Sequence, residues 1–304
     1  MQSRSVLKIQ SPLGSNVYFI NCSPAVIIDT GHPLYTLQTI ELLQKTVSLD
    51  NVAFILCTHS HPDHLGAAAE LKRKTSAQLC IFPIENNSKL NVNHRRQLKL
   101  NLESPVFDHF LHSGENIVLE GETIHVIHTP GHADDHCCFY FSERKLLFTG
   151  DLIVNEDIGF LNLNKPYRDS MREMNSSFDL CSHFPVKKVF TGHGNPYRNV
   201  PWEKHKRKLL LLEKNPQLLI AHTLISPFIF YLWSQKKLSV GQCEQYIIDH
   251  TYLFEGFLEN VTADLILQNF RKLLSLLEIR NVIIRKDNHI RGNFSENLVS
   301  QWFK

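Results

Sequence analysis

The sequence predicts an α/β protein with two domains, one over residues 1–200 and a mostly helical one over residues 201–304. The length of 304 residues suits two domains of ~150 residues each. Short apolar runs alternate with helix-prone segments up to about residue 200, as expected for alternating strands and helices. From Trp202 to about Glu278 helical periodicity dominates. The turn-forming residues Asn195-Pro196 and Asn199-Val-Pro201 mark the change, so we place the domain boundary there.

The first part of the chain predicts a sheet with accompanying helices. Two apolar runs in residues 17–30 flank the turn residues Asn21-Cys-Ser-Pro24, which favours two strands joined by a turn. Apolar residues then recur at helical spacing over 37–47, and a short apolar run at 52–57 predicts a buried strand. A helix over 66–74 and a strand over 77–82 follow. Residues 86–101 are polar and are expected to form a loop or a short helix.

A second sheet is predicted after residue 116. Four apolar runs at 116–119, 123–129, 136–141 and 145–150 are separated by turn-forming or charged residues. Ser170 and Glu173 have the spacing of a capping box, so a helix is expected to begin at Ser170, with Met171, Met174 and Phe178 on one face. A last strand is expected within Lys187–Gly194.

The C-terminal part is predicted to contain helices and a hairpin. A helix start is expected at Ser239, an amphipathic helix over 265–277, and two short strands around Lys286-Asp-Asn288. Helices followed by a hairpin resemble a winged helix. The most apolar stretch, 218–233, is shorter than the ~20 residues of a membrane span and is expected to be a buried helix. It contains apolar residues that would pack over the first domain or form a homodimer contact: Phe228, Phe230, Tyr231 and Trp233.

Composition excludes several classes of protein. Hydrophobic residues make up 43% and charged residues 20%, which are values of an ordinary folded protein. The net charge of +2 indicates neither a nucleic acid nor a membrane as partner. Residues 1–20 lack the apolar run of a secretory signal, so we expect a cytoplasmic protein. The seven cysteines form no CxxC pair, and we expect buried thiols rather than disulfides.

Three histidines and one aspartate lie within six positions directly after the strand predicted at 52–57, in the segment Thr58-His59-Ser60-His61-Pro62-Asp63-His64. In an extended segment His59 and His61 point the same way, while Asp63 and His64 lie where the chain bends into a helix. Imidazole and carboxylate groups suit zinc, with iron or manganese as alternatives. One pair of side chains would serve one ion and the other pair a second ion.

Four groups cannot complete two coordination shells, so further ligands must come from elsewhere in the chain. His132, Asp151 and His193 each follow an apolar run and stand next to a glycine. Together the seven residues can build a binuclear site. His59, His61 and His132 would hold one ion and Asp63, His64 and His193 the other, with Asp151 as the bridge.

The HxHxDH motif, the downstream histidine, the aspartate and the final histidine resemble, in this order, the metallo-β-lactamase superfamily. The resemblance covers residues 15–200, and the Asp29-Thr-Gly31 strand end also looks like that of the family. It implies an αββα sandwich with the site at one edge of two packed sheets. It also implies a hydrolase that uses a hydroxide shared by the two ions.

Within the superfamily, the aspartates at 63 and 151 depart from the antibiotic-cleaving zinc β-lactamases, many of which carry Cys at the position of Asp151. Hydroxyacylglutathione hydrolases, lactonases and RNA-cleaving members look closer. The segment Thr129-Pro-Gly-His-Ala-Asp-Asp-His136 and the helical tail resemble a subgroup with a C-terminal winged-helix-like domain, which includes thioester hydrolases and endoribonucleases.

Other residues are expected to support the reaction. Asp63 would orient the hydroxide and accept its proton, acting as both ligand and catalytic residue. Asp29 and His136 would orient ligands, although a turn role for Asp29 and a backbone hydrogen bond for His136 are the alternatives. The loop 152–169 carries candidate substrate-binding residues, for which a solvated surface role is the alternative: Lys165, Tyr167 and Arg168.

The leading hypothesis is a hydrolase of a small ester-type substrate, either a thioester or a lactone. The first alternative is an RNA-cleaving enzyme whose tail guides the strand through Arg280, Arg285, Lys286 and Arg291. The second is a di-iron redox protein of the same fold, although such members usually need a flavin partner domain. A non-enzymatic binding protein would need an incomplete ligand set, and this chain keeps all seven residues.

Overall fold

The computed structural model describes residues 5–10, 15–83, 105–215, 218–219, 221–222, 228, 232, 237–249 and 262–293. The first sheet has six strands in the order β1 to β6, of which β1, β2 and β3 are antiparallel and β3 to β6 are parallel. The strands are β1 (Val6–Gln10), β2 (Asn16–Ile20), β3 (Ala25–Ile28), β4 (Val52–Cys57), β5 (Gln78–Ile81) and β6 (His109–Phe110). The helices of this half are η1 (Pro33–Tyr35), α1 (Thr36–Thr46), α2 (Pro62–Leu65) and α3 (Ala68–Lys74).

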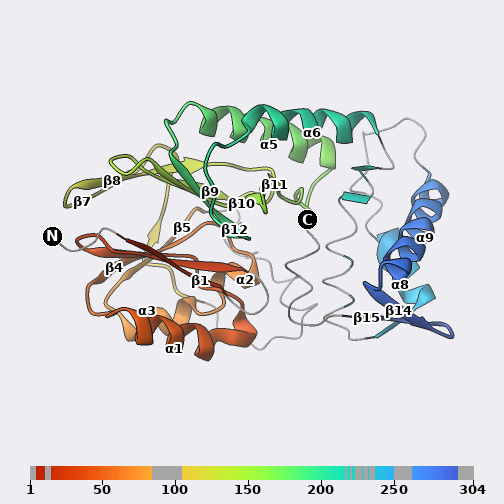
Figure 1. Cartoon of the computed structure of the whole chain (residues 1–304), viewed down its shortest axis with the longest axis horizontal. Coiled ribbons are helices and arrows are strands. Elements are labelled where there is room, and N and C mark those ends of the chain that lie inside the picture. Colours follow the sequence, from red (N-terminus) through yellow and green to blue (C-terminus); the bar gives the residue numbers. More distant parts are fainter. Residues whose placement is uncertain are drawn as a thin grey trace.

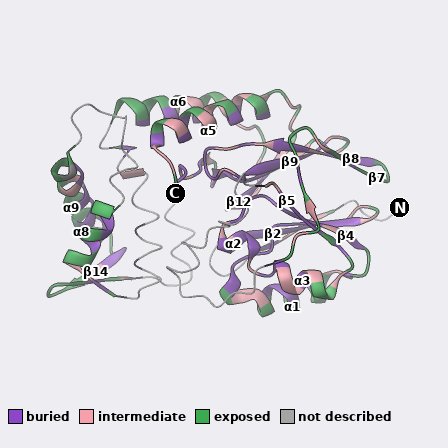
Figure 2. Ribbon diagram, turned by 180° about the vertical axis from the view of Figure 1, so that it is seen from behind, coloured by how far each residue is buried: buried purple, intermediate pink, exposed green. Residues whose placement is uncertain are grey.

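Both faces of the first sheet are covered, as the parallel strands require. Every residue of β2 and β3 is buried. Ile27 packs in one apolar cluster with Leu43 of α1 and Leu71 of α3. Its neighbours Val26 and Ile28 point the opposite way, into a second cluster shared with the other sheet. Figure 2 shows this buried interior between helices whose outer faces are exposed.

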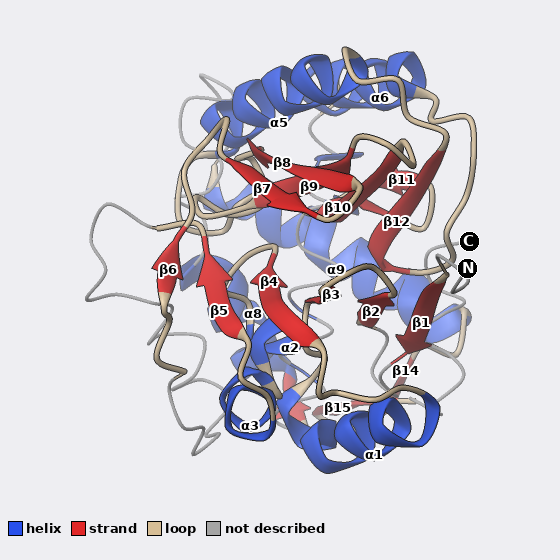
Figure 3. Ribbon diagram, turned by 90° about the vertical axis from the view of Figure 1, so that its left-hand side faces the viewer, coloured by secondary structure: helices blue, strands red, loops and turns tan. Residues whose placement is uncertain are grey.

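The second sheet has the order β11-β10-β9-β8-β7, with β12 parallel to β10. Its strands are β7 (Asn116–Leu119), β8 (Glu122–His128), β9 (Cys137–Phe141), β10 (Leu146–Val154), β11 (Asp157–Ile158) and β12 (Lys188–His193). Helices α5 (Tyr167–Ser182) and α6 (Trp202–Lys214) lie over its outer face. The four layers are visible in Figure 3. The expected αββα sandwich is confirmed.

Two boundaries differ from the sequence prediction. Helix α5 begins at Tyr167 rather than at Ser170, because the carbonyl of the N-cap residue Pro166 already accepts the backbone N–H of Asp169 at 3.1 Å and that of Ser170 at 3.2 Å. The Ser170 hydroxyl is buried and lies near the Pro166 carbonyl instead of capping the helix. Strand β10 does not stop at Gly150 but continues to Val154, with register irregularities against β12 on either side of Gly150. Asp151 therefore lies inside the strand, just past a bulge.

The C-terminal elements are β13 (Leu238–Ser239), α8 (Val240–Asp249), α9 (Ala263–Ile279), β14 (Ile283–Lys286) and β15 (His289–Gly292). The strands form a small sheet in the order β13-β15-β14. The two helices and the hairpin are confirmed, whereas the winged-helix description and the boundary at residue 200 stay predictions. Phe228 is buried, with its ring 4.9 Å from that of Phe270. Residues 86–101, Phe230, Tyr231 and Trp233 lie outside the described residues.

Two further expectations concern thiols and membranes. All seven cysteines are free, and only Cys22 is partly exposed. Among the described helices, none has the length and apolar character needed to cross a membrane.

Candidate metal centre

The HxHxDH segment adopts the predicted geometry. It follows β4, and His61 is the N-cap of the short helix α2, with extended φ and ψ of −64° and 143°. His61 therefore lies on extended chain, with His59 in the loop before it, while Asp63 and His64 lie in the first turn of the helix. One segment thus directs its side chains to two neighbouring positions.

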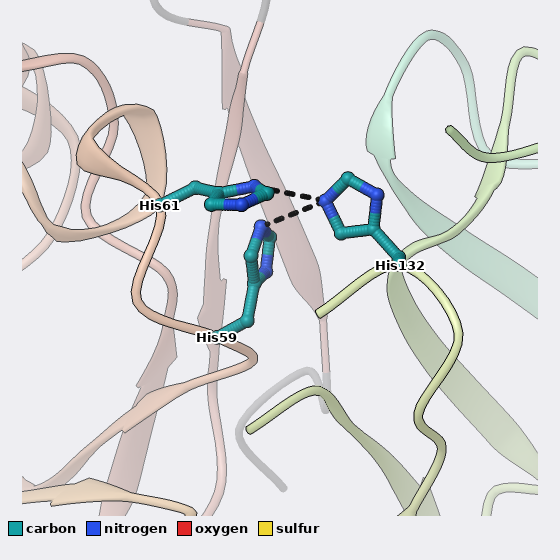
Figure 4. Close-up of side chains that lie close together, drawn as sticks. All are labelled: His59, His61 and His132. Atoms are coloured by element: carbon teal, nitrogen blue, oxygen red, sulfur yellow. Dashed lines mark hydrogen bonds between the residues drawn. The ribbon is translucent and has the colours of Figure 1, made fainter. Parts of the chain in front are cut away.

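The first cluster consists of three histidines from two loops. Nε2 of His132 lies 3.2 Å from Nε2 of His59 and 2.9 Å from Nδ1 of His61. Figure 4 shows the three rings converging on one point. Tetrahedral zinc with bonds of ~2.0–2.1 Å would place its ligand nitrogens about 3.3 Å apart. The observed spacing is close to that value, so the three nitrogens fit a single ion.

The second cluster consists of Asp63, His64 and His193. Oδ2 of Asp63 lies 3.2 Å from Nε2 of His193 and 3.7 Å from Nε2 of His64. His193 ends β12, so the two halves of the sandwich both contribute to this cluster. These three groups also lie close enough together to hold one ion.

Asp151 lies between the two clusters. Its Oδ2 is 3.7 Å from Nε2 of His132 and 3.4 Å from Nε2 of His193. Its Oδ1 is 3.4 Å from Nε2 of His64. The carboxylate thus faces ligands of both clusters, as expected of a bridge.

The donor set fits metal ions rather than a self-contained polar network. His64 Nε2 and Asp151 Oδ1 are buried and have no hydrogen-bond partner among the described residues. Buried polar atoms normally find partners, so these two indicate a ligand that the side chains surround. Imidazole nitrogens and carboxylate oxygens are suitable ligands for zinc and neighbouring first-row metals.

The opposite ring nitrogens of three ligands have oxygen partners. Nδ1 of His132 lies 2.8 Å from the Phe160 carbonyl, and Nδ1 of His64 lies 2.8 Å from Oδ2 of Asp29. Nδ1 of His59 lies 3.0 Å from the Thr58 hydroxyl. Because the carbonyl and the carboxylate can only accept, Nδ1 of His132 and His64 donates and Nε2 keeps its lone pair for a metal.

Asp29 organises both clusters. Besides His64, it accepts hydrogen bonds from the Thr58 backbone N–H at 2.8 Å and from the Thr58 hydroxyl at 2.9 Å. That hydroxyl has used its proton on Asp29 and is left to accept from Nδ1 of His59. Asp29 therefore fixes one ligand directly and another through Thr58.

His136 orients the strand that carries the bridge. Its Nδ1 lies 3.0 Å from the Thr129 carbonyl, and its Nε2 accepts the backbone N–H of Asp151 at 3.1 Å. Burial, with the neighbouring His132 adding to it, lowers the pKa of His136 to about 3. A neutral His136 is the form that can accept from the Asp151 backbone.

The two clusters differ in their electrostatics. Burial and the neighbouring His64 hold the pKa of His59 well below its ordinary value, so this ring is neutral, the form that can bind a metal. Burial also lowers the pKa of His193, but Asp151 and Asp63 outweigh burial and raise it to about 10. Burial raises the pKa of Asp63, but His64 and His193 outweigh burial and hold it below its ordinary range.

Glycines make room for the ligands. A Cβ on Gly192 would lie 2.1 Å from Oδ1 of Asp151 and 2.8 Å from Cε1 of His64. Only glycine fits at this position without displacing a ligand. Thr58, Gly192 and the Phe160 carbonyl were missed by the sequence prediction. Thr58 stands directly before the motif, which is a usable signal, whereas the Phe160 carbonyl has none.

The predicted substrate-binding residues do not face the centre as a group. Tyr167 is the first residue of α5, and its side chain has no exposed surface and packs in the core, which removes it from contact with a substrate. Lys165 forms ion pairs with Asp134 and, at 2.9 Å, with Glu173. Both Tyr167 and Arg168 lie in the first turn of α5 rather than on the loop, because the helix starts early. Substrate contacts by Lys165 and Arg168 stay predictions.

Comparison with known sequences finds one family. The family model described as the metallo-beta-lactamase superfamily matches residues 11–193. An atrochrysone carboxyl ACP thioesterase of Aspergillus terreus is 30% identical over 169 residues, covering 54% of this chain and 46% of that protein. A thioesterase of the same name from Claviceps purpurea is 29% identical over 218 residues, covering 68% of this chain and 60% of that protein. A lactamase-like protein of Pestalotiopsis microspora is 28% identical over 190 residues, covering 62% of this chain and 51% of that protein. The chain thus spans about half the length of the curated relatives it matches.

Solved structures show the same fold. A metallo-beta-lactamase family protein from Thermus thermophilus has a TM-score of 0.57 at 17% identity, covering 95% of this chain and 98% of that one. A metallo-beta-lactamase superfamily protein from Sulfolobus tokodaii has a TM-score of 0.51 at 23% identity, covering 68% and 86%. At this identity the likeness concerns the fold alone.

Proposed function

The chain belongs to the metallo-β-lactamase superfamily, and from this premise we propose that it is a binuclear metal-dependent hydrolase that cleaves a thioester. One observation carries the proposal. Two side-chain clusters face each other across Asp151, and two of the atoms directed between them, Nε2 of His64 and Oδ1 of Asp151, are buried without a hydrogen-bond partner among the described residues. Zinc is the ion we expect.

Each residue has a role in this proposal. His59, His61 and His132 would hold one ion, and Asp63, His64 and His193 the other, with Asp151 shared. When bound, the ions supply an activated water and polarise the substrate carbonyl. Asp63 would hold that water by a hydrogen bond and accept its proton at a carboxylate oxygen. Asp29 and His136 keep His64 and Asp151 in place through the contacts given above.

A thioester fits both the relatives and the chemistry. Two of the relatives are named as acyl carrier protein thioesterases. A thiol has an ordinary pKa of ~8.5, so it leaves as a thiolate without a strong general acid. An alcohol or an amine depends more strongly than a thiol on a proton donor when it leaves. A thioester therefore demands less of the site's residues than an ester or an amide does.

The alternatives have weaker support. The relatives reported above are named as thioesterases or lactamase-like proteins, and neither name implies an RNA substrate. In the described part of the tail, Arg285 pairs with Glu278 at 3.3 Å, which reduces the positive charge of that surface. Lactone cleavage, a homodimer, iron or manganese at the site, and the cytoplasmic location stay predictions.

The experiment uses the thioester benzoyl-N-acetylcysteamine, with thiol release as the readout. Protein stripped with a chelator is expected to be inactive and to recover with zinc. The Asp151→Ala variant is expected to stay inactive at any zinc concentration. Parallel assays with γ-butyrolactone and with a short RNA separate the alternatives. Turnover that survives metal removal, or turnover of RNA but not of the thioester, would contradict the proposal.

A further inference from the structure

We propose that the protein has a further metal site, separate from the catalytic centre, formed by His109, His112 and Glu115. The three side chains lie where the edge strand β6 of the first sheet leads into β7 of the second. None of the seven catalytic ligands takes part. The donor atoms all lie within 4.8 Å of one another.

The Glu115 carboxylate divides its two oxygens between the two imidazoles. Oε1 lies 2.6 Å from Nε2 of His109, and Oε2 lies 3.0 Å from Nδ1 of His112. Neighbouring ligands of one ion at bond lengths of ~2.1 Å are about 3.0 Å apart in octahedral geometry. The two imidazoles and the carboxylate are therefore close enough together for one donor atom from each residue to bind a single ion. The His132 cluster shows the same close approach of donor atoms, with nitrogens 2.9–3.2 Å apart.

The backbone holds the three residues in place. His109 is paired with Cys80 in the first sheet. The Glu115 backbone N–H donates to the His112 carbonyl at 3.1 Å, and its carbonyl accepts from Val126 of the second sheet at 2.9 Å. The His112 backbone N–H donates to the Glu115 carboxylate at 3.0 Å. Because the side chains are already oriented, they would need to move little to bind an ion.

Two imidazoles and one carboxylate form a ligand set suited to zinc and its first-row neighbours. The His112 side chain is 74% exposed and that of Glu115 is 15% exposed, so water can complete the coordination and the ion can exchange. An ion here would link the edge of the first sheet to the start of the second. Binding to the folded state alone would stabilise the contact between the two layers.

The test uses equilibrium dialysis against low-micromolar free zinc and compares the number of zinc ions bound per chain in the wild type and in variants. The wild type is expected to hold one ion more than His112→Ala and one more than Glu115→Gln. The control is His289→Ala, which removes an exposed histidine from the hairpin and is expected to match the wild type. The difference between wild type and variant isolates this site, whatever number of ions the catalytic centre holds and whatever it hydrolyses.

A second readout follows the stability. Zinc in excess is expected to raise the Tm of the wild type further than that of His112→Ala, and the two metal-free proteins are expected to unfold at similar temperatures. Equal zinc content in wild type, His112→Ala and Glu115→Gln would overturn the proposal and leave only a hydrogen-bonded turn. Thioester turnover by His112→Ala is expected to equal that of the wild type.

Discussion

Oδ2 of Asp29 lies 2.8 Å from Nδ1 of His64, 35 positions further along the chain, and both side chains are fully buried. The same carboxylate reaches His59 through the Thr58 hydroxyl. One residue at the end of β3 therefore sets the direction of a ligand in each cluster. A change at Asp29 is therefore expected to disturb both clusters without removing any of their donor groups.

Replacing Asp29 by Asn is expected to weaken metal binding without removing a ligand. The amide cannot match the charge that the carboxylate offers to Nδ1 of His64, and loss of such partners typically costs 10–100-fold in metal affinity. Competition with a coloured chelator measures the affinity. Asp50→Asn, on an exposed turn, is the control. Unchanged affinity in Asp29→Asn would show that His64 is oriented by its own backbone alone.

Gly159 is expected to tolerate no side chain. A Cβ there would lie 1.7 Å from the carbonyl oxygen of Asp151, so alanine must displace the strand that carries the bridge. Gly159→Ala should lose metal affinity and thioester turnover by tenfold or more. In the matched variant Gly241→Ala the nearest atom lies 3.9 Å from the new Cβ, and we expect no loss. Equal behaviour of the two variants, measured by chelator competition and turnover, would refute the steric argument.

Helix α6 is expected to stabilise the metal centre from outside. His205 lies 3.1 Å from the Glu156 carbonyl, and Lys208 forms an ion pair with Asp157. Both contacts hold the β10–β11 hairpin, after which the Phe160 carbonyl accepts from His132.

His205→Ala should therefore lower both the Tm of the metal-free protein and its affinity for zinc, the latter several-fold. Lys204→Ala, on the exposed face of the same helix, serves as control. A lower Tm with unchanged affinity would confine the role of His205 to packing.

His222 is expected to make stability depend on pH. Burial, together with the charge of Lys208, lowers its pKa from 6.5 to about 4. Between pH 6.5 and pH 4, His222 is therefore protonated in the unfolded chain but neutral in the folded chain. The contribution of neutral His222 to the free energy of unfolding is complete above pH 6.5 and is lost as the pH falls towards 4.

Urea unfolding at pH 7.5 and pH 5 tests this for the wild type and His222→Gln. The free energy of unfolding of the wild type should fall by of order 1–2 kcal/mol more than that of the variant between the two pH values. The residues of the metal centre titrate alike in both proteins, so their contribution to the pH dependence cancels in the comparison. A parallel fall in both proteins would show that His222 does not titrate as described.

The sequence predicted the fold, and it named the seven residues that the structure brings together, because both depend on local patterns. The strand at Val52–Cys57 and the bend at Pro62 follow from apolar periodicity and from a proline at the first helical position. His132, Asp151 and His193 could be named because each follows an apolar run and stands next to a glycine, although Asp151 lies inside β10 and not at its end.

Other features depend on contacts between distant segments and left no local signal. The capping-box spacing at Ser170 was outweighed by Pro166, which starts α5 one turn earlier and carries Tyr167 into the core. Strand β10 continues past Asp151 because β12, 39 to 42 residues further along the chain, pairs with it on both sides of the bulge at Gly150. The partner of His132 is a backbone carbonyl, which residue type cannot reveal.

A zinc titration of the metal-free His112→Ala variant tests most directly whether two ions act together across Asp151. This variant lacks the proposed third site, so added zinc reports on the catalytic centre alone. We predict that hydrolysis of benzoyl-N-acetylcysteamine rises until two equivalents of zinc are bound and then stays constant. Full activity at one equivalent, or hydrolysis without any metal, would contradict the account.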